Sequence, residues 1–177
     1  LFRGGMPRIH SSRIPPVRFY ADYFRTYVER DVRKLVNVAD LDRFERFMKL
    51  LAGRIGGLVN KQSLASDAGV SDKTIGNWIG VLRASYIVFE LHPYGRNFGK
   101  RQVKSPKMYF TETGLAAYLL GIRSERDIAV HPLVGNLFEN FVVSEAVKSR
   151  LNRGLEPDIS FYRNSSGTVE IDLVFED

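Results

Sequence analysis

Between residues 60 and 115 the apolar positions change from helical to strand spacing. Leu64, Ala65 and Ala68 share one face of a short helix over 61–68, which Gly69 is expected to end. A second helix follows Ser71 as N-cap, with apolar residues every three or four positions: Ile75, Ile79, Leu82 and Tyr86. IVFEL (87–91) and KMYF (107–110) have the composition of strands. The order helix, turn, helix, hairpin predicts a winged helix-turn-helix.

Helices are also predicted on both sides of this unit. Residues 1–16 are rich in Arg, Gly and Pro and are interpreted as an extended linker. Apolar stripes predict a helix over 17–36 and another from Asp40 to about Ile55. Further on, a short helix is expected between Thr111 as cap and Gly121 as stop.

The last part of the chain combines a long helix with a hairpin. Residues 131–153 carry a predicted apolar arc of Val134, Leu137, Phe138, Phe141 and Val142, with Glu139 on its flank. ISFYR and TVEIDLVFE are expected to form two strands joined by a turn at 164–167. The whole chain is therefore predicted to be α+β, with a mainly helical body followed by an α/β segment that lacks its remaining strands.

Composition limits the classes of protein that fit. A hydrophobic fraction of 44% argues against disorder, and no apolar run approaches a membrane span. The absence of cysteine excludes thiol chemistry and is compatible with the cytoplasm, and the three histidines lack zinc-ligand spacing. The chain starts without Met and is interpreted as a fragment.

Charge is divided unequally along the chain. Residues 1–110 hold 20 Lys and Arg against 9 Asp and Glu, and residues 111–177 hold 6 against 11. The basic part suits a polyanion such as duplex DNA, whereas ordinary solvated faces are the alternative. Candidate phosphate or base contacts are Lys73 and Asn77 on the second helix and, in the wing, Arg96, Lys100, Arg101, Lys104 and Lys107. Because Gly76 and Gly80 share the outward face, a protein-docking surface is also considered.

Two carboxylates indicate a different chemistry. Glu139 on a helix followed by Asp172 on a strand is the order of the metal-binding acids in restriction-endonuclease-like folds. Such acids hold Mg²⁺, which activates water and neutralises the phosphate. The lysine that normally follows on a later strand is not within this chain, so ordinary surface acids are the alternative reading of Glu139 and Asp172.

Several segments together resemble a known family. KSPKMYFTETGLAAYLLG, HPLVGNLFENFVVSEAVK and FYRNSSGTVEIDLVFE are similar to the C-terminal domain of unknown function of prokaryotic AAA+-type ATPases. GGMPRI resembles the junction that leaves the ATPase domain. The resemblance implies Glu139 and Asp172 as the matching catalytic and metal-binding acids. It also implies a separate N-terminal ATPase domain as partner, with ATP and Mg²⁺ as cofactors of the full-length protein. No GxxxxGK[ST] loop is present, so no nucleotide cofactor is expected in this fragment.

These observations give one set of predictions. Residues 1–16 are expected to link to the ATPase domain, 17–122 to form the helical and winged-helix domain, and 123–177 to form a partial restriction-endonuclease-like domain. The expected function is a DNA-contacting accessory module in the cytoplasm, without a membrane partner. A Mg²⁺-dependent nuclease in the full-length protein and a non-catalytic docking scaffold are the alternatives. Whether the chain belongs to an active enzyme is left open, and the DNA site and any protein partner are not named.

Overall fold

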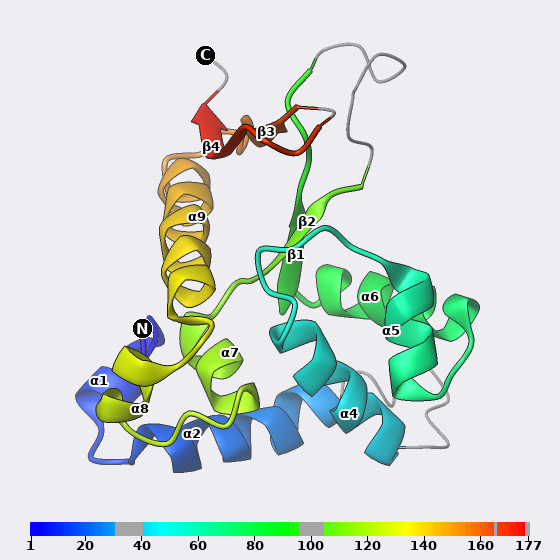
Figure 1. The fold of residues 1–177 in the computed structure, drawn as a ribbon. Helices are drawn as coiled ribbons and strands as arrows, with labels where there is room; N and C mark the ends of the chain where they lie inside the picture. Colours follow the sequence, from blue (N-terminus) through cyan, green and yellow to red (C-terminus); the bar gives the residue numbers. More distant parts are fainter. Residues whose placement is uncertain (31–40, 96–104, 165, 176–177) are drawn as a thin grey trace.

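The computed structural model describes residues 1–30, 41–95, 105–164 and 166–175, and its fold is α+β, as predicted. A layer of helices supports a central hairpin, and a long upright helix with a second hairpin stands beside it (Figure 1). The helices are α1 (Pro7–Ser11), α2 (Pro16–Tyr23), a π-helix η1 (Phe24–Glu29), α4 (Leu41–Ala52), α5 (Lys61–Ala68), α6 (Asp72–Ala84), α7 (Thr113–Leu119), α8 (Glu125–Val130) and α9 (Val134–Asn152). The strands are β1 (Val88–Leu91), β2 (Lys107–Phe110), β3 (Ile159–Arg163) and β4 (Glu170–Phe175).

The predicted helix, turn, helix and hairpin are present. One signal was wrong: Tyr86, predicted on the apolar face of the second helix, lies beyond the end of α6 and is 79% exposed. Gly69 ends α5 in the left-handed conformation, with φ of 71°. The hydroxyl of Ser71 accepts a hydrogen bond from the N–H of Thr74 and caps α6. β1 and β2 are antiparallel, with Val88 opposite Phe110. Trp78 of α6 is buried in the core and meets Phe44 of α4 edge to face, with 5.4 Å between the ring centres.

The first residues are not the extended segment that their composition predicted. Pro7–Ser11 form helix α1, and Ile9 is buried in the main core. The N–H of Gly5 donates to the carboxylate of Glu112, whose Oε1 also accepts from the hydroxyl of Tyr20. Burial and the neighbouring Glu112 carboxylate both raise the pKa of Tyr20. The prediction failed because the partner that orders this segment, Glu112, lies far along the chain.

In the second half one predicted cap is wrong and one short helix was not predicted. Glu112, rather than Thr111, caps α7, since its carboxylate accepts from the N–H of Gly114. The connection after Gly121 contains α8, which begins with a capping box between Ser124 and Asp127. The predicted helix over 17–36 begins one residue early, widens into η1 after Tyr23, and lies outside the described residues from 31 onward, as does the predicted cap Asp40.

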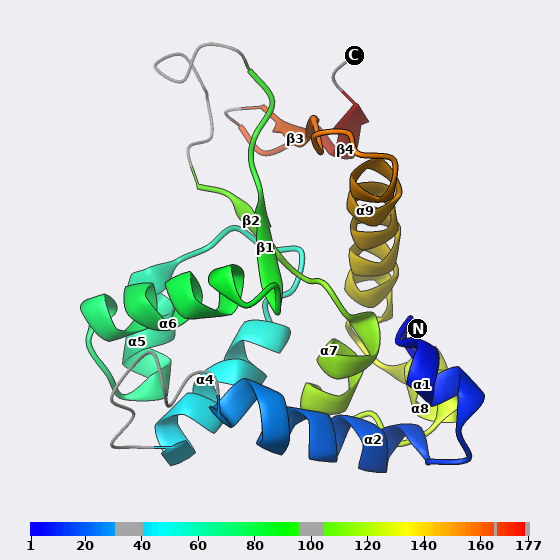
Figure 2. The ribbon, with the colours of Figure 1, turned by 180° about the vertical axis from the view of Figure 1, so that it is seen from behind.

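The β1–β2 hairpin separates two apolar clusters. In the reverse view it stands between α6 and α9 (Figure 2). On one face Val88, Met108 and Phe110 belong to the core of the helical layer. On the other face Leu91 and Tyr109 pack with Val143 of α9 and Phe161 of β3. The side chains alternate because successive residues of a strand point to opposite faces. The hairpin therefore joins the helical body to the α9–β3–β4 unit.

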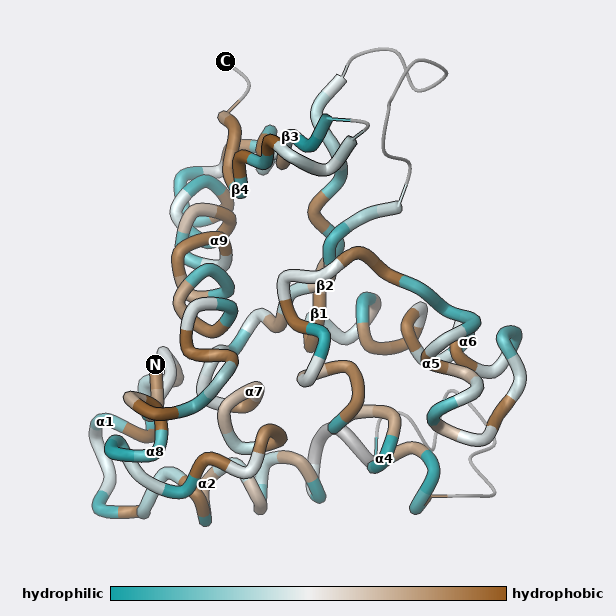
Figure 3. The backbone as a smooth tube through the Cα atoms, in the orientation of Figure 1, coloured by the Kyte–Doolittle hydropathy of each residue, from teal (hydrophilic) through white to brown (hydrophobic). Residues whose placement is uncertain are grey.

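Helix α9 buries a different face from the predicted arc. Its buried residues are Leu137, Asn140, Val143 and Ser144. Phe138 is 59% exposed, and the other predicted arc residues apart from Leu137 are also exposed. Hydrophobic segments recur along the tube of α9 (Figure 3). The spacing of the apolar residues alone therefore does not identify the face that packs against the core. The side-chain amide of Asn140 determines which face of α9 is buried. Its oxygen accepts from the N–H of Phe110 at 2.7 Å, and its nitrogen donates to the hydroxyl of Thr113 at 2.9 Å.

Within the described ranges, none of the helices has both the length and the apolar content that a bilayer crossing requires.

Candidate functional site

A buried lysine lies where the two parts of the molecule meet. Lys107 is the first residue of β2 and forms an isolated antiparallel bridge with Leu58 on the other side of that strand. Only 2% of the residue is exposed. Its ammonium lies 5.4 Å from the centre of the Phe161 ring, which closes the apolar side of the site. A charge buried to this degree requires partners of opposite sign.

Three carboxylates from the C-terminal unit supply those partners. The Nζ atom of Lys107 lies 3.0 Å from Oε1 of Glu139, 2.5 Å from Oε1 of Glu170 and 2.8 Å from Oδ1 of Asp172. Glu139 comes from α9, whereas the other two acids are two positions apart on β4 and therefore share one strand face. Arg163 on the neighbouring strand lies 3.5 Å from the second oxygen of Glu170. We refer to Lys107, Glu139, Glu170 and Asp172 as the Lys107 cluster.

Tyr109 and Gly56 hold Glu139 in place. The hydroxyl of Tyr109, two residues after Lys107 on β2, donates to Oε1 of Glu139 at 2.5 Å. Burial, and then this carboxylate, raise the pKa of Tyr109, so the phenol remains a donor. A Cβ atom on Gly56 would lie 3.2 Å from the Glu139 oxygens, and its φ of 73° also favours glycine. Glu139 thus lies between Tyr109 of β2 and the turn after α4.

Opposing effects act on the pKa of Lys107. Burial lowers it, but the hydrogen bonds to Asp172, Glu170 and Glu139 outweigh burial and raise the pKa above its ordinary value. The cluster contains three acids and one lysine, so it keeps an excess of negative charge that Arg163 offsets in part. Asp172 is the open side of the cluster, with 56% of its side chain exposed.

The structure brings together some predicted residues and separates others. Glu139 and Asp172, predicted as a pair from a helix and a strand, bind the same ammonium. Lys107 was predicted among the phosphate contacts of the wing, but its ammonium is turned into the molecule and is paired with the chain's own acids. Glu170 and Tyr109 were missed. Their signal is spacing, since each is two residues from another member of the site on the same strand.

The carboxylates of the Lys107 cluster are the groups that would have to bind the Mg²⁺ ion that the resemblance implies. Carboxylate oxygens are suitable ligands for Mg²⁺. The position shared by Glu139 and Asp172 is, however, filled by the Lys107 ammonium, which supplies the positive charge instead. Across the described part of the chain, no group of three or more His, Cys, Asp or Glu residues is arranged to hold a metal ion. In this arrangement the cluster does not fit a metal.

The outward face of α6 is the second candidate surface. Lys73 and Asn77 are exposed, as predicted. Apart from its chain neighbours and the backbone of its own helix, a Cβ atom added at Gly76 or Gly80 would meet no described atom within 4 Å. This face is therefore flat and open, and nothing in the described residues packs closely against the two glycines. The remaining wing candidates, Arg96, Lys100, Arg101 and Lys104, lie outside the described residues.

Comparisons with known proteins agree with a molecule built from two parts. Residues 1–126 match the family DUF8612, described as a domain of unknown function, and residues 134–177 match DUF4143, also a domain of unknown function. Because the first match covers more than half of the sequence, the chain belongs to the DUF8612 family. The Lys107 cluster joins the two matched regions, since Lys107 lies in the first and its three acids lie in the second.

Two longer mycobacterial proteins are similar to almost the entire chain. They are the uncharacterized protein Mb2031c of Mycobacterium bovis and the uncharacterized protein Rv2008c of Mycobacterium tuberculosis. Each is 30% identical over 176 residues, which is 98% of this chain and 39% of the relative. The chain therefore spans well under half of their length. No solved structure matches.

Proposed function

We propose that this chain is the non-ATPase C-terminal part of a prokaryotic AAA+-type ATPase and that it contacts duplex DNA through a winged helix-turn-helix. In this proposal α6 is the helix that faces the DNA and the β1–β2 hairpin is the wing. The C-terminal unit is a scaffold that the Lys107 cluster fastens to the hairpin. The proposed whole protein works in the cytoplasm, and its ATPase domain supplies ATP hydrolysis with Mg²⁺.

The observation that carries the proposal is the open face of α6. Lys73 and Asn77 are exposed on it, and no side chain of the described residues lies within 4 Å of a Cβ position at Gly76 or Gly80. A phosphate backbone can therefore approach the helix closely. Lys73 offers a phosphate contact, and Asn77 has the two hydrogen-bonding groups that recognise adenine in the major groove. The excess of basic residues in 1–110 supports a polyanionic ligand.

DNA binding by the chain is expected to depend on Lys73 and on salt. Replacing Lys73 with Glu should weaken binding to a mixed-sequence duplex by roughly tenfold at low salt and reduce the log–log salt slope by about one. Fluorescence anisotropy of a labelled duplex measures both quantities. Arg126→Glu is the matched control, because Arg126 is exposed on α8 at the far end of the helical layer (Figure 1). Absence of salt-dependent binding, or equal loss in both variants, would contradict the proposal.

The Mg²⁺-dependent nuclease is the second candidate, because Glu139 and Asp172 meet at one point of the structure. The scaffold proposal predicts no such activity, since Lys107 fills that point. Incubating the full-length protein with plasmid DNA and Mg²⁺ distinguishes the two. Cleavage that Asp172→Ala abolishes, with Asp158→Ala on an exposed position as control, would replace the scaffold with a nuclease.

A further inference from the structure

Helix α9 carries large apolar side chains on two faces, and only one of these faces is buried. The helix stands upright at the edge of the molecule (Figure 1). Its buried face contains Leu137 and Val143. Its other face carries four apolar side chains that are between 37% and 59% exposed: Val134, Phe138, Phe141 and Val142. Residues at positions i, i+4, i+7 and i+8 share one side of a helix. We refer to these four residues as the α9 stripe.

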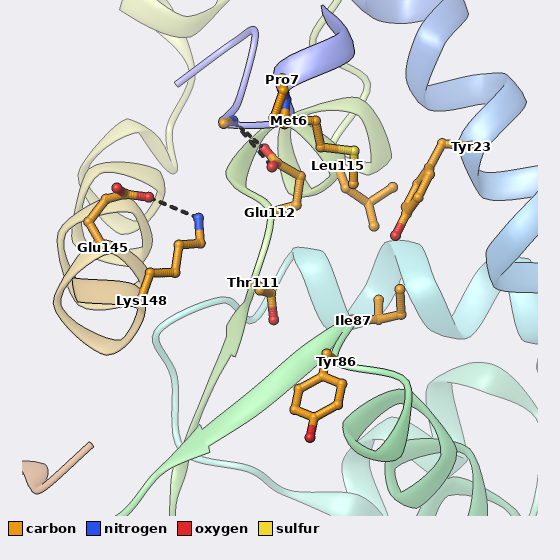
Figure 4. A pocket seen from close by; sticks show the side chains of 11 residues that line it. Met6, Pro7, Tyr23, Tyr86, Ile87, Thr111, Glu112, Leu115, Glu145 and Lys148 are labelled. Carbon is orange, nitrogen blue, oxygen red and sulfur yellow. Dashed lines mark hydrogen bonds and ion pairs between the residues drawn. The ribbon is translucent and has the colours of Figure 1, made fainter. Parts of the chain in front are cut away.

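The α9 stripe contains no charged residue. Between positions 134 and 142 the one charged residue is Glu139, and its carboxylate binds Lys107 inside the molecule. The next charged residues along the helix, Glu145 and Lys148, pair with each other at 2.8 Å and line a pocket of about 310 Å³ (Figure 4). A molecule that covers the stripe is therefore held by apolar contact rather than by ion pairs.

A glycine next to the α9 stripe leaves room for another helix. Gly135 is exposed in the first turn of α9. Apart from its chain neighbours and the backbone of its own helix, a Cβ atom added there would meet no described atom within 4 Å. Because glycine has no side chain, a second backbone can approach this end of the stripe closely.

The area of the α9 stripe matches the small end of specific protein interfaces. Two phenylalanines that are about half exposed and two valines that are less exposed offer roughly 300 Å² of apolar surface per copy. A pair of such stripes would cover roughly 600 Å². Because interfaces are about 60% apolar, the total area buried would be about 1,000 Å². This is the area at which a specific interface begins, so pairing should be reversible at micromolar concentrations.

We infer that the α9 stripe is a self-association surface, on which the stripe of a second copy of this chain packs with the two helices antiparallel. One two-fold contact then covers the apolar face of both copies. The antiparallel direction opposes the two helix dipoles, whereas a parallel pair would align them. Phe138 of each copy meets Phe141 of the other. Val142 of the second copy comes level with Gly135, where the missing side chain leaves space.

Sedimentation of the chain over a range of about 1 to 200 µM tests the inference. The mass should rise from that of a monomer to that of a dimer, and Phe138→Glu should raise the dissociation constant roughly a hundredfold, because it buries a charge against a ring. Its unfolding midpoint should stay close to that of the original chain, since Phe138 is mostly exposed. Leu151→Glu is the matched control, because Leu151 is 51% exposed on another side of the same helix, and it should dimerise normally. A monomer at every concentration would leave the stripe to some other partner and overturn the inference, as would equal effects of both variants.

Single cysteines test the direction of the pairing, because the chain contains no cysteine of its own. A mixture of Phe138→Cys and Phe141→Cys should form a disulfide-linked dimer with one chain of each kind under mild oxidation. Val134→Cys alone should not form one, since antiparallel helices place the two copies of this residue at opposite ends of the contact. Crosslinking of Val134→Cys to itself, or of none of the variants, would contradict the antiparallel pair. None of these results bears on DNA binding, because the α9 stripe includes neither Lys73 nor Asn77.

Discussion

Replacing Lys107 with Met is expected to lower the free energy of unfolding by about 3 kcal/mol, since it leaves three carboxylates facing one another without their shared cation. Removing one partner of a buried ion pair costs about 3–5 kcal/mol in general. The lower end applies here because more than half of the Asp172 side chain is exposed and solvent reduces the repulsion. This loss of unfolding free energy should be larger than the loss from removing one partner of any surface ion pair in the chain.

Chemical denaturation measures this effect, and Lys148→Met is the matched control. Lys148 forms a partly exposed pair with Glu145 within α9, and its loss should cost less than about 1 kcal/mol. If Lys107→Met is no more destabilising than Lys148→Met, the cluster does not fasten the two parts of the molecule. Neutralising an acid in the same background, as in Lys107→Met with Asp172→Asn, should recover part of the loss.

The same cluster should make stability sensitive to high pH. The pKa of Lys107 is raised in the folded chain above its ordinary value of 10.5, so the contribution of this lysine to the free energy of unfolding is complete below about pH 10.5. It is lost as the pH rises through the folded-state pKa, because the unfolded chain releases this proton more readily. The variant with Met at 107 should lack this part of the alkaline decline.

Gly114→Ala is expected to cost about 2–3 kcal/mol through overpacking of a rigid site. A Cβ atom at this position would lie 2.3 Å from the Tyr20 hydroxyl oxygen and 2.4 Å from the nearest atom of the ring. The ring cannot move aside easily, since Tyr20 is 1% exposed and its hydroxyl bonds to the carbonyl of Arg3 and to Glu112. The change would therefore also loosen the N-terminal segment from α7.

Gly80→Ala is the control, because it is the same substitution inside a helix but into open space. It should stabilise the chain by up to about 1 kcal/mol, through the better helix propensity of alanine. Thermal unfolding of both variants should thus give shifts of opposite sign. A neutral Gly114→Ala would mean that the contact between Tyr20 and α7 is not close-packed.

Local signals predicted the central part of the fold well. Gly69 and Ser71 each act on neighbouring backbone, so their roles could be inferred from the sequence. The prediction of an extended conformation for 1–16 failed because Glu112, which accepts from the N–H of Gly5, is more than a hundred residues away. The apolar arc of α9 failed because a buried amide, Asn140, decides which face turns inward. A prediction from the spacing of apolar residues takes no account of a buried polar residue such as Asn140.

Only part of the candidate site was predicted from the sequence. Glu139 and Asp172 were identified from their order on a helix and a strand, and they do meet. Lys107 was predicted as part of the wing because it follows a run of basic residues. In the structure it lies on the same face of β2 as Tyr109, and this face points into the molecule. A strand's two faces differ in environment, and that difference depends on packing against α9, which spacing along the chain does not encode.

Mapping the surface that duplex DNA touches tests the central proposal most directly. Titrating the isotopically labelled chain with duplex while recording amide chemical shifts should perturb Lys73, Gly76, Asn77 and Gly80 on the outward face of α6. The amides of α9, β3 and β4 should remain unchanged. Perturbations confined to those three elements, or no perturbation at any duplex concentration, would contradict a DNA-contacting role for α6.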